Sequence, residues 1–595
     1  MLDPIVEVSA AEGLQGWLQA TYNPNYDEYL VVWEEYRNAD TTGSDIWGQF
    51  IRGDGTRRGD NFPICQTVGD QFWPHVAFNK YAGCYLVVFE DHRNDTSGAR
   101  QWEGNWDVYG ALLDMDGRHI PAATSEADTC FAISTNPAAA HYTVVSFNDR
   151  QETFLAAWAD YRNGHIDIYG QIVSSEGSPL GPPTPPDPTI NFPIITGDAN
   201  DDVPDVSYCA PTDEWLVVCA SGDWEDSRVM GQRVSGTGER LRPDGSSGAE
   251  PMVISEAARL GTDPVQPRVE FNNEWLTGLA KSGALAGLWQ ALVIWKCRPG
   301  EWADIYGQRV AIISDADAVA LGLKDPPAVP GRFIATLMNE LGKPGATASE
   351  NFPISDAPGY KSAAEIAYGQ QDNEYVIGWG AARDITAPQN HDFYVQRLGM
   401  APDSALIWWN LDRSDTVASS ANIPVDTTAF YEGGLVAAAY GSHHNEFFFV
   451  YTFASTGLMK NAAGGASAKE AGETSRSTEV DLYGRRLAGS PPTGAQHARG
   501  ALPLQFAVYH NYLNPFNPQT TISFTLPAEM IVKLELFDIT GHKVNSLLDE
   551  RRPAGRHEVV WNGTDQRGAT LPSGVYLYRL TMGTSSYTGK MTLLR

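Results

Sequence analysis

The sequence lacks long apolar runs and lacks a leader at its start. None of its 595 residues belongs to an apolar run of the ~18 residues that a membrane-spanning helix needs, so we expect no membrane span. The opening segment, MLDPIVEVSA, has neither a basic stretch nor an apolar core. Because the C-terminal features described below predict export, we expect the protein to carry a secretory signal peptide that is not part of this sequence.

Positive charge is scarce. The chain has 42 Lys and Arg against 73 Asp and Glu, which gives a net charge of −31. A surface this acidic repels phosphate groups, so we expect neither nucleic acid nor an anionic membrane as a partner. It suits a solvated, self-repelling protein, or one that meets divalent cations. We expect no cofactor, with calcium as the one open alternative.

Cysteine is also rare, and no two cysteines have the C-x-x-C spacing of a metal site. Most stand inside apolar runs, such as CYLVVF from Cys84 and EWLVVC up to Cys219. Buried free thiols fit this placement, while one or two disulfides stay open for an exported protein. The six are Cys65, Cys84, Cys130, Cys209, Cys219 and Cys297.

Short enzyme signatures are missing as well. The sequence has no S-x-D-x-G-x-x-W box, no G-x-S-x-G elbow, no H-E-x-x-H pair and no P-loop. It also has no D-x-D-x-D-G calcium loop. These absences weaken an enzymatic interpretation, and they leave the catalytic residues of any such enzyme unknown.

Aromatic and turn-forming residues, in contrast, are abundant. Phe, Trp and Tyr make up 11% of the chain, and there are 57 Gly and 37 Pro, which predicts short strands joined by many turns. A pentapeptide like DIYGQ recurs seven times, at spacings of 62, 60, 61, 76, 88 and 89 residues. The copies begin at Asp45, Asp107, Asp167, Arg228, Asp304, Asp392 and Asp481.

Each copy has similar neighbours. Two apolar segments that end in aromatic residues precede it, as in LQATYN and YLVVW, and a short FPI-like strand follows it. Four strands per repeat predict a seven-bladed β-propeller over residues 1–487. The seventh repeat has no FPI-like strand, so we expect residues 4–8 to supply one beside residues 481–487, because an open sheet edge is costly.

The last 90 or so residues differ from the repeats. They contain NPFNP, an Asn-Gly turn in WNGTDQRG and the segment SGVYLYRL, in a strand–turn–strand order that predicts a small β-sandwich. This segment, 506–595, resembles the type A C-terminal sorting domain of type IX secretion, akin to the flagellar hook-capping immunoglobulin-like domain. The matching residues include Asn514, Pro515, Phe516, Asn517, Pro518, Gly574, Tyr576 and Lys590.

The resemblance implies export, recognition by the type IX outer-membrane translocon, and a place outside the cell or on its outer surface. Residues 488–505 are expected to be a linker. The repeats resemble, more loosely, secreted TolB-like propellers with W-x-D-x-R-N-G…D-I-Y blades; the best copy is ADYRNGHIDIYGQ from Ala159. Neither resemblance names a reaction.

Several residues are candidates for ligand binding. Arginines follow the apolar strand in five repeats, where they either form a ring that binds anions or serve the fold, with Arg162 bridging Asp160 and Asp167. His92 and two tryptophans lie in a loop of the second repeat, where aromatic faces suit sugars. The candidates are Arg37, Arg93, Arg162, Arg298, Arg383, His92, Trp102 and Trp106.

Three functions remain open from the sequence. A surface module that binds glycan or protein is favoured by the regular repeats. A secreted polysaccharide lyase or glycoside hydrolase with its site in the propeller mouth is the alternative, and a structural part of an extracellular assembly is the third. Two or three convergent carboxylates in the funnel of the ring, or a Tyr/His/Arg cluster there, would favour an enzyme.

Overall fold

The structure is a computed structural model, and it is built from β-strands. It describes residues 5–9, 11, 14–39, 41–95, 104–122, 129–180, 191–222, 227–255, 266–272, 289–297, 304–314, 333–338, 346–347, 350–356, 361–362, 364–382, 391–400, 406–409, 423–426, 431–454, 480–488, 507–508, 519–526, 529–553, 555–582 and 585–593. Within these ranges no helix is long and apolar enough to cross a membrane. The chain forms two compact units, one with strands β1 to β32 and one with β33 to β39.

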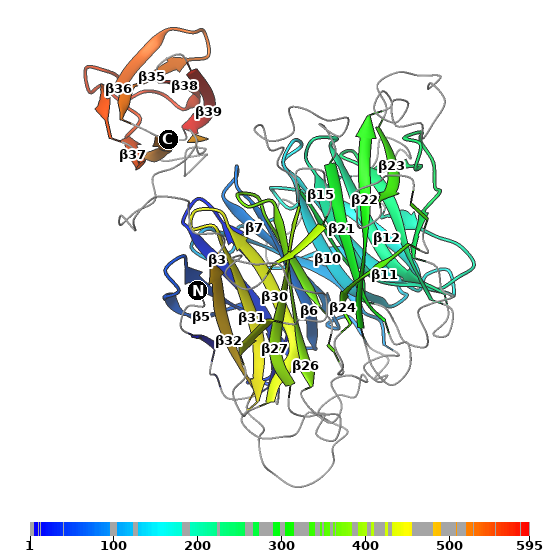
Figure 1. The fold of residues 1–595 in the computed structure, drawn as a ribbon. Coiled ribbons are helices and arrows are strands. Elements are labelled where there is room, and N and C mark those ends of the chain that lie inside the picture. Colours follow the sequence, from blue (N-terminus) through cyan, green and yellow to red (C-terminus); the bar gives the residue numbers. More distant parts are fainter. Residues whose placement is uncertain are drawn as a thin grey trace. The chain divides into compact units, whose positions relative to one another are not determined.

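The described part of the first unit holds seven antiparallel sheets, which we number in chain order (Figure 1). Sheet 1 has β2 (Gln15–Asn23), β3 (Glu28–Glu35), β4 (Asp45–Arg52) and β5 (Arg57–Cys65). Sheet 2 has β6 (Gln71–Asn79), β7 (Cys84–Asp91), β8 (Asp107–Asp114) and β9 (Phe131–Ser134). Sheet 3 has β10 (Ala140–Asn148), β11 (Thr153–Asp160), β12 (Asp167–Ser174), β13 (Pro179–Leu180) and β14 (Phe192–Ile195).

Sheet 4 has β15 (Asp201–Cys209), β16 (Glu214–Ser221), β17 (Arg228–Ser235), β18 (Arg240–Leu241) and β19 (Met252–Ser255). Sheet 5 has β20 (Arg268–Phe271), β21 (Trp289–Cys297), β22 (Asp304–Ser314), β23 (Phe333–Met338) and β24 (Phe352–Ser355). Sheet 6 has β25 (Glu365–Gly369), β26 (Glu374–Ala382), β27 (His391–Met400), β28 (Leu406–Trp409) and β29 (Ile423–Asp426). Sheet 7 has β30 (Tyr431–Gly441), β31 (Glu446–Ala454), β32 (Val480–Ala488) and β1 (Val6–Ser9).

The first strands of the sheets lie against one another. We use this name for β2, β6, β10, β15, β20, β25 and β30, each of which is paired on one side only, with the second strand of its own sheet. Each first strand contacts the first strand of the next sheet, and β30 contacts β2. The backbone N–H and C=O groups along the other edge of each first strand therefore need hydrogen-bond partners, which side chains of neighbouring sheets can supply.

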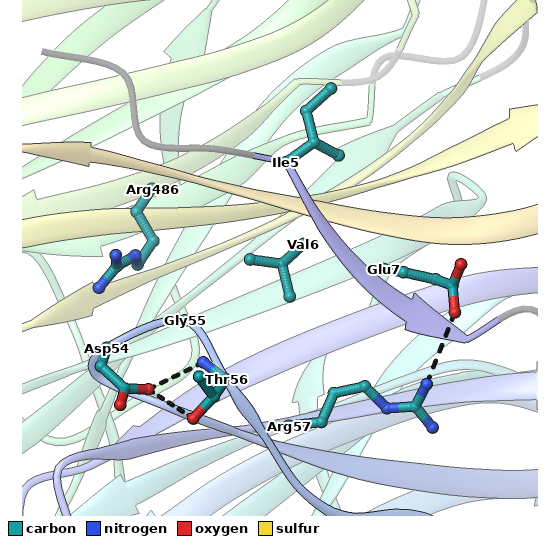
Figure 2. A pocket seen from close by; sticks show the side chains of 8 residues that line it. All are labelled: Ile5, Val6, Glu7, Asp54, Gly55, Thr56, Arg57 and Arg486. Atoms are coloured by element: carbon teal, nitrogen blue, oxygen red, sulfur yellow. Dashed lines mark hydrogen bonds and ion pairs between the residues drawn. The ribbon is translucent and has the colours of Figure 1, made fainter.

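The N-terminal strand completes sheet 7. β1 pairs antiparallel with β32, with Val6 opposite Gly484, where the sequence predicts a strand at residues 4–8. A Cβ placed on Gly484 would lie 3.4 Å from Val8, so Val8 covers this glycine as the FPI isoleucines cover theirs in other sheets. Glu7 also lies 3.6 Å from Arg57 of β5, which joins β1 to sheet 1 (Figure 2).

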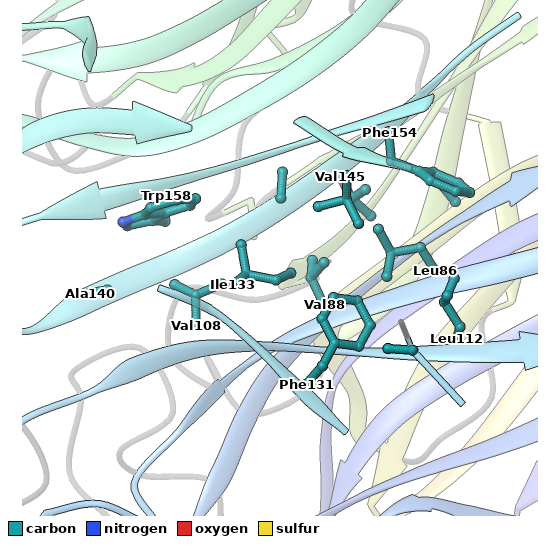
Figure 3. Packing of buried hydrophobic residues seen from close by; sticks show 14 of the residues in the cluster. Leu86, Val88, Val108, Leu112, Phe131, Ile133, Ala140, Val145, Phe154 and Trp158 are labelled. Carbon is teal, nitrogen blue, oxygen red and sulfur yellow. The ribbon is translucent and has the colours of Figure 1, made fainter. Parts of the chain in front are cut away.

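The core lies between neighbouring sheets. The second strands are buried on both faces, which is why segments such as YLVVW read as continuous apolar runs. Between sheets 2 and 3, Leu86, Val88 and Phe131 pack with Val145 and Trp158 (Figure 3). Burying each such side chain contributes about 1.5–3 kcal/mol, so these contacts between sheets dominate the stability of the unit.

Close neighbours explain the glycine that most DIYGQ-like motifs carry. A Cβ on Gly170 would lie 2.6 Å from the Ile194 side chain, and one on Gly231 would lie 2.7 Å from Ile254. Both isoleucines belong to the FPI-like strand that pairs with the same central strand. The glycine of the DIYGQ-like motif and the isoleucine of the FPI-like strand therefore pack against each other.

The second unit is a small two-sheet structure. One sheet has β33 (Ala507–Val508), β34 (Thr520–Leu526) and β37 (Gly555–Trp561). The other has β36 (Lys543–Arg552), β35 (Met530–Asp538), β38 (Gly574–Met582) and β39 (Ser585–Leu593). Ile522 and Phe524 of the first sheet share one core with Leu534, Trp561 and Tyr578.

Candidate functional site

The candidate arginine of sheet 3 serves a local contact. Arg162 donates Nε to Asp160 Oδ1 at 2.7 Å and one terminal nitrogen to Oδ2 at 2.5 Å. Its guanidinium lies 3.9 Å from the centre of the Tyr169 ring, and Trp158 Nε1 donates to the same carboxylate at 2.9 Å. The ion pair, the ring contact and burial together hold the Arg162 side chain in place, so this side chain serves the fold.

The expected bridge from Arg162 to Asp167 is wrong in its second half. Asp160 and Asp167 do face each other across the strand pair, as expected. However, Asp167 accepts a hydrogen bond from Asn163 at 2.6 Å and lies 3.2 Å from His165. Two nitrogens of the Arg162 guanidinium donate to the two oxygens of Asp160. The carboxylate of Asp167 is bonded by Asn163 instead.

The same arrangement recurs in sheets 1 and 2. Arg93 makes two bonds to Asp91, at 2.8 and 2.7 Å, and lies 4.1 Å from the Tyr109 ring centre. Arg37 pairs with Glu35 through both oxygens. The same ion pair repeats in three sheets, and in each one a carboxylate already neutralises the arginine. This pattern fits a role in the fold better than a ring of anion-binding sites. Arg298, Arg383 and Trp102 lie outside the described residues.

Trp106 and His92 stack in sheet 2. Their ring centres are 4.4 Å apart at an interplanar angle of 11°, and His92 Nε2 lies 2.8 Å from Asp95. Trp106 is only 1% exposed and also packs on Phe72. The expectation that Trp106 offers a face to a sugar is therefore corrected, because that face is already covered by protein.

Aromatic residues at the start of the first strands form a different row. Trp17, Trp73 and Tyr142 stand at equivalent β-bulges, with φ of 32°, 46° and 56°. The Trp17 and Trp73 ring centres are 4.9 Å apart, and those of Trp73 and Tyr142 are 4.4 Å apart. All three are partly exposed.

Sequence reasoning missed this row, although a signal existed. Each aromatic residue stands six positions before the residue that ends its strand, such as Asn23, Asn79 or Asn148. The equivalent position in sheet 4 is Val203, with φ of 50°. A fixed offset within the repeat indicates that these residues occupy equivalent positions in their sheets. It does not show that equivalent residues of different sheets contact one another.

Two buried glutamates hold the backbone of the row. Glu90 Oε1 accepts the Tyr142 N–H at 2.5 Å, and its Oε2 lies 3.2 Å from His141 Nδ1. The Trp73 N–H bonds to Glu34 in the same way. Burial raises the pKa of Glu34 well above its usual value and also raises the pKa of Glu90, where His141 opposes the shift.

A polar cluster lies further along the first strands of sheets 4 to 6. Arg268 Nε donates to Glu365 Oε1 at 2.6 Å, and Asp205 Oδ2 accepts the Val269 N–H at 2.7 Å. Ser207 donates to Glu270 at 3.4 Å. Burial raises the pKa of Asp205 to about 7, an effect that Arg268 opposes and the charge of Glu365 adds to. Burial and the charge of Asp205 raise the pKa of Glu270 to about 8.

The cluster reaches across to sheet 2. Burial and the charge of Arg268 lower the pKa of His75, on β6, to about 3, so this imidazole is neutral. His75 Nδ1 accepts the Val145 N–H of the next first strand at 3.3 Å. Polar side chains from four first strands, β6, β15, β20 and β25, therefore interact electrostatically.

Two hollows lie on the surface of the first unit. The larger, about 440 Å³, is lined by residues of β1, by Asp54 to Arg57 and by Arg486 (Figure 2). The other, about 390 Å³, lies beside Arg162 and Asn191. Neither gathers the several acidic or imidazole groups that the cluster of sheets 4 to 6 contains. Across the described residues, no three His, Cys, Asp or Glu side chains are placed to hold a metal ion.

The described residues of the expected sorting motif belong to the core and surface of the second unit. Tyr576 is buried against Trp561 and donates to the Pro572 carbonyl at 2.9 Å. Gly574 pairs with Leu593, and Lys590 is exposed on β39. Residues 514–518 lie outside the described part of the chain.

Comparisons with known proteins bear mainly on the second unit. Residues 511–586 match the family model of the FlgD Ig-like domain, so the chain carries a C-terminal Ig-like domain. No curated protein matches the sequence at a significant level.

Solved structures give only distant likenesses. A Dyadobacter fermentans protein of unknown function is 9% identical, with a TM-score of 0.37 over 81% of this chain and 96% of that one. A Trypanosoma rangeli sialidase is 8% identical, with 0.35 over 97% and 83%. A Penicillium chrysogenum α-L-arabinanase is 12% identical, with 0.35 over 68% and 100%. These TM-scores are too low to carry an argument about function.

Proposed function

We propose that residues 1–487 form a seven-bladed β-propeller that binds glycan where its first strands begin. The cyclic contacts of the first strands, from β2 through β30 and back to β2, support a closed ring of seven blades. Strand β1 then serves as the outer strand of the seventh blade.

The aromatic row carries the assignment of a ligand. Trp17, Trp73 and Tyr142 are partly exposed, and their rings contact one another in one series; aromatic rings pack on the C–H surface of sugars. Glu34 and Glu90 fix the backbone of Trp73 and Tyr142, so little conformational freedom is lost at these two residues when a ligand binds. A protein ligand is the other partner that such a surface can serve.

The test is a glycan array followed by calorimetry on the glycan that binds best. Trp73→Ala should weaken binding about tenfold, the effect of one lost aromatic contact of ~1.4 kcal/mol. Tyr26→Ala is the matched control, because Tyr26 is 38% exposed in the hairpin at the opposite end of the first strand. Equal losses in both variants, or no binding to any glycan by the unaltered protein, would contradict the proposal.

We further propose that the protein is exported by type IX secretion and acts outside the cell. The Ig-like match at 511–586 supports residues 506–595 as the sorting domain that the translocon recognises, with 488–505 as linker. Deleting 506–595 should leave the melting temperature of the first unit unchanged and stop export in a host with this machinery. Export that continues without residues 506–595 would refute the proposal that this domain directs secretion.

A secreted glycoside hydrolase is the second candidate. It is favoured by one observation on three neighbouring first strands: Arg268 bonds Glu365 and interacts with Asp205, and Asp205 interacts with Glu270.

A further inference from the structure

The outermost strands of neighbouring sheets are joined by a hydrogen bond that recurs around the first unit. In several sheets an asparagine stands directly before the phenylalanine of the FPI-like segment. Its side-chain amide donates to the main-chain carbonyl of the third residue of the FPI-like segment in the preceding sheet, a contact that we call the joint. The joints are Asn61 to Val8 at 3.2 Å, Asn191 to Ile133 at 3.1 Å and Asn351 to Ile254 at 3.4 Å.

A serine side chain reaches the same asparagine in two of these joints. Ser9 donates to Asn61 Oδ1 at 3.3 Å. Ser255 donates to Asn351 Oδ1 at 3.3 Å, and each serine directly follows the residue whose carbonyl accepts the amide. The side chains at these two positions of a joint are therefore in direct contact.

The joint between sheets 1 and 2 has a cysteine at both positions. Cys130 stands directly before Phe131, and its Sγ lies 3.7 Å from the Ile64 carbonyl oxygen, which is the acceptor of this joint. Cys65 follows Ile64 and so occupies the serine position. The side chains of Cys65 and Cys130 also form a hydrogen bond with each other. The two sulfur atoms thus meet where a hydroxyl and an amide meet in the other joints.

Sheet 2 also lacks the second partner of the asparagine. In sheets 1 and 3 the joint asparagine donates to the glutamine of the DIYGQ-like motif, Gln49 at 2.8 Å and Gln171 at 3.0 Å. In sheet 2 that position is Ala111. The polar network of the other joints is absent among these residues, and both cysteines are only 2% exposed. The contact between the two sulfur atoms therefore replaces that network.

The surroundings of Cys65 determine how fast its thiol can react. An Arg93 terminal nitrogen donates to Cys65 Sγ at 3.3 Å, and a nearby cation favours the thiolate, which is the form that attacks a disulfide. The bond to Cys130 and burial raise the pKa of the Cys65 thiol well above its usual value, and Arg93 opposes the rise. The folded protein should therefore oxidise slowly at this pair, and a chain whose sheets are still open should oxidise faster.

We propose that Cys65 and Cys130 form a disulfide that joins sheets 1 and 2 when the protein meets a disulfide oxidant, as exported proteins do. The thiolate of one cysteine attacks the oxidant and displaces one thiol, and the second cysteine then attacks this mixed disulfide and releases the other thiol. The two cysteines lose two electrons and two protons, which the two released thiols carry. Cys84, Cys209, Cys219 and Cys297 stay reduced. The bond closes a loop that contains β6, β7 and β8.

The experiment uses the full chain, purified with reductant and then incubated with a mixture of oxidised and reduced glutathione in urea below the unfolding transition. Thiols are counted after denaturation without reductant, and peptide mass spectrometry locates any cross-link. The count should fall from six to four, with a single cross-link between Cys65 and Cys130. The melting temperature of the first unit should rise by roughly 3–6 °C, because the cross-link restricts the unfolded chain.

Two variants serve as controls. Cys65→Ser combined with Cys130→Asn restores the pair found at Ser255 and Asn351, so it should fold, and glutathione should change neither its thiol count nor its melting temperature. Cys297→Ser removes a cysteine outside the pair, so its count should fall from five to three.

Three results would overturn the proposal. They are a count that stays at six in the unaltered protein, a cross-link between other cysteines, and a loss of two thiols in the double variant. The count and the cross-link in the unaltered protein decide the matter whether or not a variant folds. Because the oxidant is supplied in the tube, the outcome is independent of the glycan and export proposals.

Discussion

His444 Nε2 lies 2.6 Å from Asp27 Oδ2 and so joins the hairpin after β30 to the hairpin after β2. Tyr22 donates to the other oxygen of Asp27 at 2.8 Å, and His443 lies 3.6 Å from it. Asp27 has a φ of 53°, and in sheet 4 Asp213 stands at the same turn position with a tyrosine bonded to it. The histidines therefore add a contact between sheets 7 and 1 to a turn that the fold repeats.

The first prediction concerns the pH dependence of this contact. Asp27 raises the pKa of His444, and the two histidines with Tyr22 lower the pKa of Asp27. The stability that His444 contributes is full below its unfolded pKa and is lost as pH rises through its raised folded pKa. The part that Asp27 contributes is present above its unfolded pKa and is lost as pH falls through its lowered folded pKa.

His444→Gln should therefore lower the melting temperature more at pH 6 than at pH 9. The difference should amount to less than about 1 kcal/mol, because both groups are partly exposed and screened. His542→Gln, at an exposed site of the second unit, is the control. The same loss at both pH values would show that the histidine acts by packing alone.

The second prediction concerns Arg162. Arg162→Ala leaves the fully buried Asp160 carboxylate without its cation, so unfolding should become easier by about 2–3 kcal/mol. Arg118→Ala removes an arginine that is 73% exposed and should change stability by less than about 0.5 kcal/mol. Urea unfolding of both variants checks this, and similar values for the two would argue that the buried pair stabilises nothing.

The third prediction tests the contact between the two repeated motifs. Gly170→Ala forces a methyl group to within 2.6 Å of Ile194 and should destabilise the first unit by about 1–3 kcal/mol. Gly197→Ala is its control, because no atom lies within 4 Å of the new methyl group there. Melting temperatures that fall equally in both variants would contradict this account.

The fourth prediction concerns the thiols. All six cysteines are free and buried, and burial raises the pKa of Cys84, Cys209 and Cys297 to about 12. Before oxidation, the native protein should react with none of its thiols in an aromatic disulfide assay at pH 8, and the denatured protein with all six. A lower count in denaturant without reductant would reveal a disulfide.

The sequence predicts how the repeated strands pair within a sheet, but not which side chains at the ends of those strands contact one another. The spacing of DIYGQ and FPI places Gly170 beside Ile194, because both strands pair with their neighbours along the chain. The partner of Asp167 was assigned wrongly, because Asn163 and Arg162 stand one residue apart and spacing alone does not rank them. Burial of Trp106 depends on Phe72 and His92, whose rings fold over it.

The candidate site was less predictable still. Asp205, Arg268 and Glu365 are far apart in sequence, and they meet because three first strands lie side by side. A single polar residue in an apolar strand does not reveal which strand it will face. Only the order of the sheets supplies that information.

The place of β1 has a consequence for the timing of folding. Val6 is synthesised at the start of the unit and its partner Gly484 at the end, so sheet 7 stays incomplete until nearly the whole unit exists. Contacts between such distant parts of a chain form slowly, because their loop entropy is lost before they contribute. For an exported chain, an unfinished last sheet would keep the unit open during passage through a membrane, and its rigidity would arise only on the far side.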